Sequence, residues 1–405
     1  MDCKIKPALL KGEVNIPSSK SYCHRYILGA SLCKGKSLLR NVSFSKDIYA
    51  TLEGIKSFGA NYKIVGNSVE ISGISDDNSI SEVYCNESGS TLRFLIPILT
   101  VLKNNVMLTG EKRLFERPLT PYFDIFKEND IQYEIGKTYI KINGTFKNKK
   151  FVLPGDVSSQ FITGMLYAGV LMNKDIEIFI SSNLESRPYI DMTLKALKDF
   201  GINIENNNYK SFYIKKGQTF KETDIIVEGD YSQAAFFITA NFLGNNININ
   251  NVFDKSVQGD KEIVNIIKEY KNSGYAKTDV SQIPDLVPIL AVAASLRDGD
   301  TKIYGAKRLR LKESDRLYAI TKALKNLGAD IEEGQDYLYI KGKRCLEGGA
   351  IDSVNDHRIA MACAVASTKC RNCVIIKNSK CVEKSYPDFW SDFKNLGGKF
   401  ITGEF

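Results

Sequence analysis

The chain has 405 residues, of which 43% are hydrophobic and 25% charged, with 30 Gly and only 10 Pro. This composition excludes a mainly disordered, collagen-like or disulfide-scaffold protein. The length predicts two or three domains, because single cores seldom grow beyond about 250 residues. The formal net charge of +8 fits either weak nucleic-acid affinity or small anionic substrates, and composition does not decide between them.

The first residues, the apolar runs and the cysteines indicate in which cellular compartment the protein works. The first residues carry frequent charges, and the apolar runs at 94–102 and 286–296 are too short to span a bilayer. Nine cysteines and only two histidines fit a reducing compartment and exclude a multi-histidine metal site. Cys370 and Cys373 have metal-like spacing, but no second Cys pair or nearby His completes a zinc site. We therefore expect a cytoplasmic protein without a bound metal.

One pattern recurs six times along the chain: an amphipathic helical stretch, a turn residue and a short alternating strand. The turn residues are spaced by 71, 71, 73, 54 and 69 positions, and they are Gly59, Asp130, Gly201, Gly274, Gly328 and Gly397. Gly suits the left-handed conformation that ends a helix before a strand. The pattern predicts six α/β units of about 67 residues that pack on one another. The alternative is that this common loop chemistry repeats by chance.

Several segments combine cations with small or hydroxyl residues. Four of them precede expected helices, at residues 17–25, 86–93, 116–121 and 156–163. Helix N-termini with free N–H groups, hydroxyls and cations bind anions, although each segment alone is also typical of an ordinary helix cap. The C-terminal half adds denser charged clusters at residues 284–285, 307–316, 356–358 and 383–388.

Taken together, these motifs resemble the 5-enolpyruvylshikimate-3-phosphate synthase (3-phosphoshikimate 1-carboxyvinyltransferase) family. The resemblance is carried, in order, by Lys-Ser-x3-Arg at 20–25, Ser-Ser-Gln-Phe at 158–161, Lys-Glu-Ser-Asp-Arg at 312–316, Asn-Asp-His-Arg at 355–358 and Lys-Ser-Tyr-Pro-Asp at 384–388. It implies an α/β (α+β) fold of two similar domains, each of three βαβαββ units forming an inside-out α/β barrel, with the active site in the interdomain cleft. We expect residues 1–17 plus 230–405 to form one discontinuous domain and residues 18–229 the inserted one.

The resemblance also implies a reaction and its residues. The family transfers the enolpyruvyl group of phosphoenolpyruvate to the 5-hydroxyl of shikimate 3-phosphate, releases phosphate and uses no cofactor. At the matching positions, the residues implied for shikimate 3-phosphate are Lys20, Ser21, Arg25, Ser158, Ser159, Gln160, Ser186, Asp285 and Lys312. Those implied for phosphoenolpyruvate are Lys20, Gly89, Arg93, Arg117, Gln160, Arg316, Arg358 and Lys384. The implied catalytic residues are Asp285 as base, Glu313 as acid, and Lys384 and Lys20.

The residue types suit such substrates. Two phosphates and two carboxylates bring roughly −5 to −6 of charge, so a cationic site is the first requirement. Glu313 presents a conflict, because an acid that donates a proton needs a raised pKa whereas neighbouring cations lower it. Burial of Glu313 or proton delivery from Lys384 would resolve this conflict.

Two positions depart from the family pattern. Glu87 lies in a segment where many members have Asn-Ala-Gly-Thr, and Arg308 replaces a family Asn, so that ligand is not carried over. We expect Glu87 to face away from the ligands or to pair with an Arg. Both departures bear on the response to phosphoenolpyruvate mimics such as glyphosate.

Two other functions are compatible with the fold or the net charge, and specific residues count against each of them. The UDP-N-acetylglucosamine enolpyruvyl transferase shares the fold, but it expects Lys-Asn at the first motif and a reactive Cys in the loop around Arg117, where this chain has none. A nucleic-acid-binding protein expects a basic strip interleaved with aromatic residues, which this chain lacks. We therefore expect small-molecule substrates, no nucleic-acid or membrane partner, and a monomer.

Overall fold

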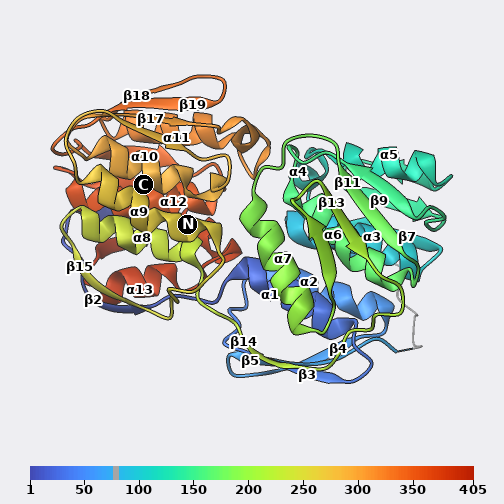
Figure 1. The fold of residues 1–405 in the computed structure, drawn as a ribbon. Helices are drawn as coiled ribbons and strands as arrows, with labels where there is room; N and C mark the ends of the chain where they lie inside the picture. Colours follow the sequence, from blue (N-terminus) through green and yellow to red (C-terminus); the bar gives the residue numbers. More distant parts are fainter. Residues whose placement is uncertain (76–81) are drawn as a thin grey trace. The chain divides into compact units, whose positions relative to one another are not determined.

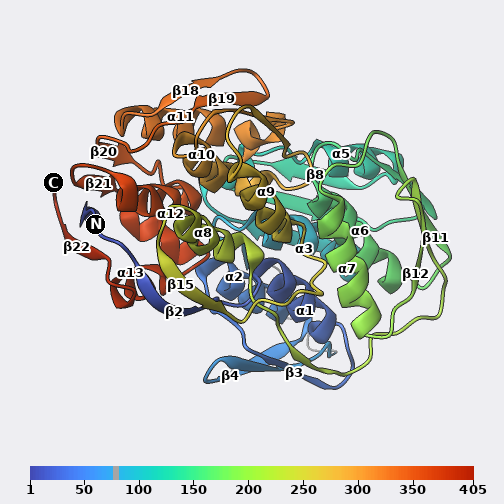
Figure 2. The same cartoon turned by 60° about the vertical axis from the view of Figure 1, so that its left-hand side comes forward.

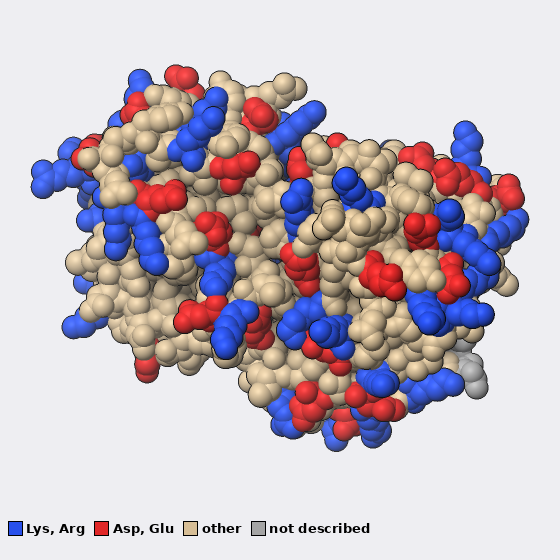
Figure 3. All heavy atoms as spheres, viewed as in Figure 1, with Lys and Arg blue, Asp and Glu red and all other residues tan. Residues whose placement is uncertain are grey.

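The computed structural model describes residues 1–75 and 82–405, and the chain divides into two compact units (Figure 1). Unit 1 comprises Met1–Pro17 and Gly229–Phe405, and unit 2 comprises Ser18–Glu228. No helix in the described part of the chain is both long and apolar enough to cross a bilayer. On the face shown in Figure 3, acidic and basic side chains are interspersed.

Helices and strands alternate through unit 2. Its elements in chain order are α1 (Lys20–Ser31), β3 (Lys36–Arg40), α2 (Lys46–Ile55), η1 (Lys56–Phe58), β4 (Asn61–Val65), β5 (Ser68–Ser72), β6 (Glu82–Tyr84), α3 (Gly89–Leu102), β7 (Asn105–Thr109), α4 (Lys112–Phe115), α5 (Thr120–Glu128), β8 (Gln132–Ile135), β9 (Tyr139–Asn143), β10 (Lys150–Leu153), α6 (Ser159–Leu171), β11 (Ile176–Ile180), α7 (Arg187–Asp199), β12 (Ile204–Asn207), β13 (Ser211–Ile214) and β14 (Asp224–Ile226).

Unit 1 has the same alternation and several short 3-10 helices, labelled η. Its elements in chain order are β1 (Asp2–Lys6), β2 (Lys11–Asn15), α8 (Tyr231–Phe242), β15 (Asn246–Asn250), η2 (Gly259–Glu262), α9 (Ile263–Tyr270), β16 (Ala276–Asp279), η3 (Pro284–Leu286), α10 (Val287–Ser295), β17 (Asp300–Tyr304), η4 (Lys307–Leu311), α11 (Arg316–Asn326), β18 (Asp330–Glu333), β19 (Tyr337–Lys341), β20 (Gly349–Asp352), α12 (His357–Ala366), η5 (Ser367–Lys369), β21 (Val374–Lys377), η6 (Ser379–Lys384), α13 (Phe389–Asn395) and β22 (Lys399–Gly403).

Among the described residues, five of the six sheets share one plan, a parallel pair followed by two strands that are each antiparallel to their neighbour. In the sheet β6-β7-β9-β8, β6 runs parallel to β7, and β9 and β8 follow antiparallel. The sheets β14-β3-β5-β4, β10-β11-β13-β12, β16-β17-β19-β18 and β20-β21-β1-β22 repeat this order. The sixth contains only the parallel pair β15-β2. The expected mixed α/β fold built from repeated units is therefore confirmed.

The turn residues of the repeat behave as their positions predict. All six have a positive φ, from 56° at Asp130 to 97° at Gly397, and each lies between a helix and a strand. After Gly274, however, the chain enters β16, the first strand of the next sheet, and no hairpin intervenes. This missing hairpin explains why the spacing between Gly274 and Gly328 is 54 residues, shorter than the other intervals.

Two sheets of unit 1 are completed by strands from the start of the chain. The N-terminal strand β1 lies between β21 and β22, with Cys3 opposite Ile376 on one side and Thr402 on the other. Strand β2 pairs with β15, with Val14 opposite Ile249. These pairings place the first residues of the chain in unit 1.

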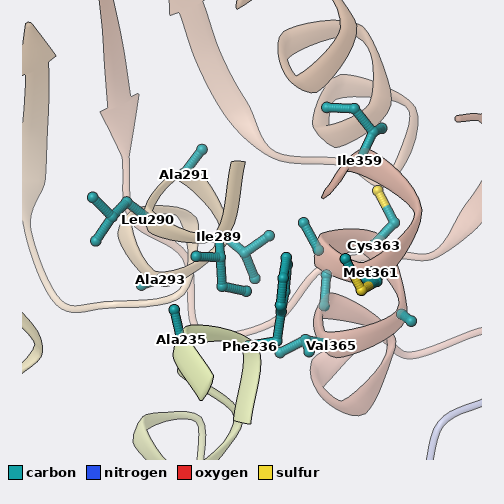
Figure 4. Packing of buried hydrophobic residues seen from close by; sticks show 14 of the residues in the cluster. Ala235, Phe236, Ile289, Leu290, Ala291, Ala293, Ile359, Met361, Cys363 and Val365 are labelled. Atoms are coloured by element: carbon teal, nitrogen blue, oxygen red, sulfur yellow. The ribbon is translucent and has the colours of Figure 1, made fainter. Parts of the chain in front are cut away.

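Largely buried helices form the centre of each unit. Every residue of α10 and α12 is buried, and α8 packs against both. Figures 1 and 4 show these three helices side by side, with Phe236, Ile289 and Met361 among the side chains between them. A helix without a polar face must be enclosed, so the sheets lie outside it.

Unit 2 is built in the same way around α1, α3 and α6. Helices α3 and α6 pack closely (Figure 2), and Gly164 allows this, since a Cβ there would lie 2.6 Å from the Arg93 carbonyl oxygen. Three motifs of the sequence analysis, at residues 17–25, 86–93 and 156–163, fall at the N-termini of these central helices.

Candidate active site

The first motif lies at the start of α1 in unit 2. Ser19 caps the helix by accepting a hydrogen bond from the Tyr22 N–H, and Lys20 Nζ lies 2.8 Å from Asp47 Oδ2. Arg25 is buried and donates to Thr193 Oγ1 at 2.8 Å and to the Tyr189 carbonyl oxygen at 2.9 Å. Most of the Arg25 guanidinium therefore holds α1 against α7.

A second group surrounds Gly89 at the start of α3. Arg93 donates from Nη1 to Gln160 Oε1 at 2.8 Å, and Gln160 Nε2 donates to Ser90 Oγ at 2.9 Å. A Cβ on Gly89 would lie 2.7 Å from Arg117 Nη1 and 2.8 Å from Arg93 Nη1. The absence of this Cβ lets two guanidinium groups approach the N-terminus of α3, where the helix dipole also favours anions.

Arg117 is the cation of this group whose surroundings bear most directly on ligand binding. It lies between α4 and α5 with 9% of its surface exposed. Its Nε is buried and has no hydrogen-bond partner among residues 1–75 and 82–405. A buried donor without a partner is costly unless a ligand or water satisfies it. Arg117 is therefore available to bind a small anion.

Three further predicted positions in unit 2 lie at helix starts. Ser158 caps α6 by accepting from the Gln160 N–H at 3.3 Å, and Ser159 is the first residue of that helix. Ser186 is buried, precedes α7 and has a φ of 56°, in the left-handed region.

In unit 1, three cations surround the carboxylate of Asp285, which lies in η3 before α10. Arg316 Nη1 and Lys312 Nζ lie 2.8 Å and 3.4 Å from Oδ1, and Arg358 Nη2 lies 3.3 Å from Oδ2. Asp285 retains 16% side-chain exposure, so it is reachable by a ligand. Positive neighbours on both oxygens stabilise the ionised form of this carboxyl group.

Arg316 connects Asp285 to two other carboxylates. Its guanidinium is 1% exposed and lies 2.7 Å from Glu313 Oε2 and 2.8 Å from Asp356 Oδ2. Burial lowers the pKa of Arg316. The three carboxylates together raise it by more than burial lowers it, so the net shift is upward. The guanidinium thus stays charged and fixes Asp285 and Glu313 on neighbouring nitrogens.

The two site lysines predicted in unit 1, Lys312 and Lys384, differ in their surroundings. Burial lowers the pKa of Lys312 and outweighs the opposing effect of Asp285. Lys384, in η6, donates to the Asn355 carbonyl oxygen at 2.8 Å, next to the residue that caps α12.

The structure therefore gathers the predicted residues into separate groups. One hydrogen-bonded cluster contains Asp285, Lys312, Glu313, Arg316 and Arg358. Lys384 contacts Asn355, the residue before Asp356, and Asp356 accepts from Arg316 of this cluster. Gly89, Arg93, Arg117 and Gln160 form a second group, and Lys20, Ser21 and Arg25 a third.

The structure adds partners that sequence reasoning did not assign. Asp47 pairs with Lys20, and Thr163 and Thr193 bind Arg25; of these three residues only Thr163 lies in a segment that the sequence analysis noted, at 156–163. Asp356, which accepts from both Arg316 and Ser314, does belong to a motif already noted.

The two departures from the family pattern lie near charged groups. Glu87 is half-buried and contributes to the raised pKa of Tyr84, although the hydrogen bond from Tyr84 to Glu111 contributes more. Arg308 donates to the Ser281 carbonyl oxygen at 2.8 Å, and its charge helps to lower the pKa of Lys312 after the larger effect of burial. Within the described residues, no group of three or more His, Cys, Asp or Glu side chains could hold a metal ion.

Comparisons with known proteins agree on one family. The model of the EPSP synthase (3-phosphoshikimate 1-carboxyvinyltransferase) family matches residues 5–393. The 3-phosphoshikimate 1-carboxyvinyltransferases of Clostridium perfringens and Clostridium acetobutylicum are 46% and 47% identical over alignments of 420 and 421 residues. These alignments cover 99% of both chains in the first case and 98% of both in the second.

Solved structures agree with this result at the level of the fold. An EPSP synthase structure from Acinetobacter baumannii superposes with a TM-score of 0.81 at 23% identity, covering 99% of this chain and 100% of the other. A second from the same organism has a TM-score of 0.82 at 22% identity and covers both chains fully. The sequence match over nearly the whole length and the shared fold lead to one conclusion: the chain belongs to the EPSP synthase family.

Proposed function

We propose that this protein transfers the enolpyruvyl group of phosphoenolpyruvate to the 5-hydroxyl of shikimate 3-phosphate and releases phosphate, as a 3-phosphoshikimate 1-carboxyvinyltransferase of the shikimate pathway. The observation that carries the proposal is the pair of carboxylates, Asp285 and Glu313, bound to one buried guanidinium in a chain of this family. Addition to a carbon–carbon double bond followed by elimination needs two acid–base groups, and this pair supplies them.

The cations divide between the anionic parts of the substrates. For phosphoenolpyruvate we assign Lys20, Gly89, Arg93, Arg117, Gln160, Arg316, Arg358 and Lys384. For shikimate 3-phosphate we assign Lys20, Ser21, Arg25, Ser158, Ser159, Gln160, Ser186, Asp285 and Lys312. The guanidinium groups suit carboxylate and phosphate because their planar N–H pairs bind two oxygens at once. Arg25 offers less than the others, since most of its guanidinium is engaged within unit 2.

The chemistry follows from the charges around Asp285. As base, its carboxylate accepts the proton of the attacking hydroxyl, and that oxygen bonds to the substituted carbon of the enol. Glu313 donates a proton to the methylene carbon, which completes the addition. Loss of phosphate and of a proton from the new methyl group then regenerates the enol. Glu313 lies 2.7 Å from Arg316, whose positive charge opposes protonation of the Glu313 carboxylate. We therefore assign to Lys384 the role of delivering a proton to Glu313.

Phosphate release tests the proposed reaction. Purified protein receives phosphoenolpyruvate with either shikimate 3-phosphate or UDP-N-acetylglucosamine, with a chelator throughout. Release with shikimate 3-phosphate alone is the expected result. Release only with UDP-N-acetylglucosamine, or no release from folded protein with either acceptor, contradicts the proposal.

Replacement of the base separates binding from chemistry. Asp285→Asn keeps the shape of the side chain but cannot accept the hydroxyl proton, so we expect turnover to fall by about 100-fold or more. The rise in Tm caused by shikimate 3-phosphate should persist. Asp298→Asn, which removes an exposed carboxylate beyond the opposite end of α10, serves as the matched control. Turnover of Asp285→Asn within a few-fold of the wild type would remove Asp285 from the role of base.

A further inference from the structure

An open cavity of about 310 Å³ in unit 2 is lined by residues of α1, α7 and β14. Tyr22 and Tyr26 line it from α1, Asp199 from α7, and Ile226 and Glu228 from the end of β14 and the residues after it. None of its described lining residues is among those assigned to the substrates. The volume falls in the range of small-molecule sites, roughly 300 to 1,000 Å³.

The Tyr22 side chain brings an unsatisfied hydroxyl group to this cavity. Tyr22 is 2% exposed, and its ring stacks on that of Tyr26 with the centroids 5.2 Å apart. Among the described residues the Tyr22 hydroxyl has no hydrogen-bond partner, whereas the Tyr26 hydroxyl donates to Asp199 Oδ2 at 3.0 Å. Burial raises the pKa of Tyr22 most, and the charge of Glu228 raises it further, so the hydroxyl lies near that carboxylate. A buried hydroxyl without a partner is costly unless water or a ligand satisfies it.

The charges around the cavity favour a cation. Its lining contains three carboxylates, those of Asp199, Asp224 and Glu228, and one cation, Lys195. Lys195 Nζ lies 2.9 and 2.8 Å from the two carboxylate oxygens of Asp199. Arg40 donates to both oxygens of Asp224, at 2.9 and 2.7 Å. Even with Arg40 counted, carboxylates outnumber cations here, so the field of the lining attracts a cation and repels an anion.

Apolar surface lies beside these polar groups. Ile226, at the end of β14, is 69% exposed, and Ile225 before it is half-buried. Both line the cavity. An exposed isoleucine alone is ordinary, but this one shares a cavity with the rings of Tyr22 and Tyr26. A ligand that suits the whole cavity therefore combines a positively charged N–H donor with a short apolar chain.

We propose that this cavity binds a small primary alkylammonium compound. The ammonium group donates hydrogen bonds to the Tyr22 hydroxyl oxygen and to the Glu228 carboxylate, and the alkyl chain lies over Ile226. An ammonium group has three donors and no acceptor, so it matches a hydroxyl oxygen and a carboxylate in one place.

The site lies on a different face of α1 from the residues assigned to the substrates. Tyr22 and Tyr26 are four residues apart and share one face of the helix, as Ser21 and Arg25 share another. The inference therefore goes beyond the proposed reaction and does not depend on it, and binding can be measured without turnover.

Titration calorimetry of the whole protein with n-butylammonium chloride at neutral pH tests the proposal, and bound ligand should also raise the Tm. Tetramethylammonium carries the same charge without an N–H donor, and potassium chloride supplies the same ionic strength. We expect both to bind at least about 10-fold more weakly. Methylammonium should bind more weakly than butylammonium, by about 4-fold for each methylene group that is buried. An equal effect of potassium chloride would show a site for an inorganic ion, and either that result or no binding of butylammonium overturns the proposal.

Two variants locate the bound ligand. Tyr22→Phe removes only a hydroxyl that no described residue uses, so the variant should fold normally and its affinity for butylammonium should fall by about 10-fold or more. Tyr275→Phe, at an exposed tyrosine of unit 1, is the matched control. Ile226→Ser should abolish the advantage of butylammonium over methylammonium, and because Ile226 is exposed this variant still tests the site if Tyr22→Phe loses stability. Wild-type affinity in folded Tyr22→Phe, or an undiminished effect of chain length in Ile226→Ser, contradicts the proposal.

Discussion

Gly89 offers the sharpest test of the anion site in unit 2. The variant Gly89→Ala places a methyl group 2.7 Å from Arg117 Nη1 and 2.8 Å from Arg93 Nη1, where ordinary contact begins at 3.4 Å. Both atoms are the far ends of flexible side chains, so the guanidinium groups retreat by about 0.7 Å while the backbone stays in place. Gly89 is the first residue of α3 and has no positive φ, so Ala suits its backbone.

The size of the effect follows from the hydrogen bonds at risk. Retreat of Arg93 and Arg117 costs roughly one charge-assisted hydrogen bond to the ligand, about 1.5–3 kcal/mol. This corresponds to an increase of about 10- to 150-fold in the KM for phosphoenolpyruvate. Stability should not fall, because Ala is a better helix former than Gly by about 1 kcal/mol.

Steady-state kinetics with each substrate varied in turn provide the assay. The KM for shikimate 3-phosphate should change by less than about 3-fold, since fewer of its assigned residues touch Gly89. Gly403→Ala is the matched control, because its Cβ would meet Phe405 at an ordinary 3.4 Å. A folded Gly89→Ala enzyme with an unchanged KM for phosphoenolpyruvate would refute the placement of the anion beside this helix.

Two further predictions concern stability and thiol reactivity. Arg316→Met should lower the free energy of unfolding by about 3–5 kcal/mol, because it leaves the fully buried Asp356 and two other carboxylates without their shared cation. Urea denaturation followed by circular dichroism measures this free energy. An unchanged denaturation midpoint would contradict the prediction. In a thiol titration of native protein at pH 8, only the half-buried Cys345 and Cys373 should react rapidly, since the other seven cysteines are buried. Burial raises the pKa of Cys370 and of Cys381 to about 12, so these thiols carry little thiolate. All nine should react in denaturant, and a third fast thiol in the native state would show that the core opens.

Local chemistry made much of the fold predictable. A residue that must end a helix and begin a strand needs a positive φ, so Gly59, Gly201 and Gly328 marked the repeat before any coordinates were known. The cap at Ser158 followed from the same kind of local rule. The missing hairpin after Gly274 did not, because a short spacing does not tell which element of a unit has been lost.

Contacts between distant segments were beyond sequence reasoning. Arg25 is separated from Thr193 by 168 positions, and only the packing of α1 on α7 brings them together. Residue types therefore led to a prediction of which groups bind anions, whereas the partners that hold those groups required the fold.

The central helices of the two units differ at their N-termini. In unit 2, α1, α3 and α6 are capped by the neutral side chains of Ser19, Ser88 and Ser158. In unit 1, α8 and α12 are capped by the carboxylates of Asp230 and Asp356, and Asp285 precedes α10. A serine cap leaves the positive end of the helix dipole available to a ligand anion, whereas an aspartate cap neutralises it. We therefore expect the helix N-termini of unit 2 to hold a ligand anion more readily than those of unit 1.

Ser158→Asp tests this division of roles. Aspartate caps a helix as well as serine does, so α6 should remain folded and the Tm should change by only a few degrees. The added negative charge would lie where we assign shikimate 3-phosphate, and we expect its KM to rise by about 10-fold or more. High salt should reduce the difference from the wild type, because screening weakens the repulsion between exposed charges. If the variant binds shikimate 3-phosphate normally at low salt, the α6 terminus holds no substrate anion, and the neutral caps of unit 2 are simply structural.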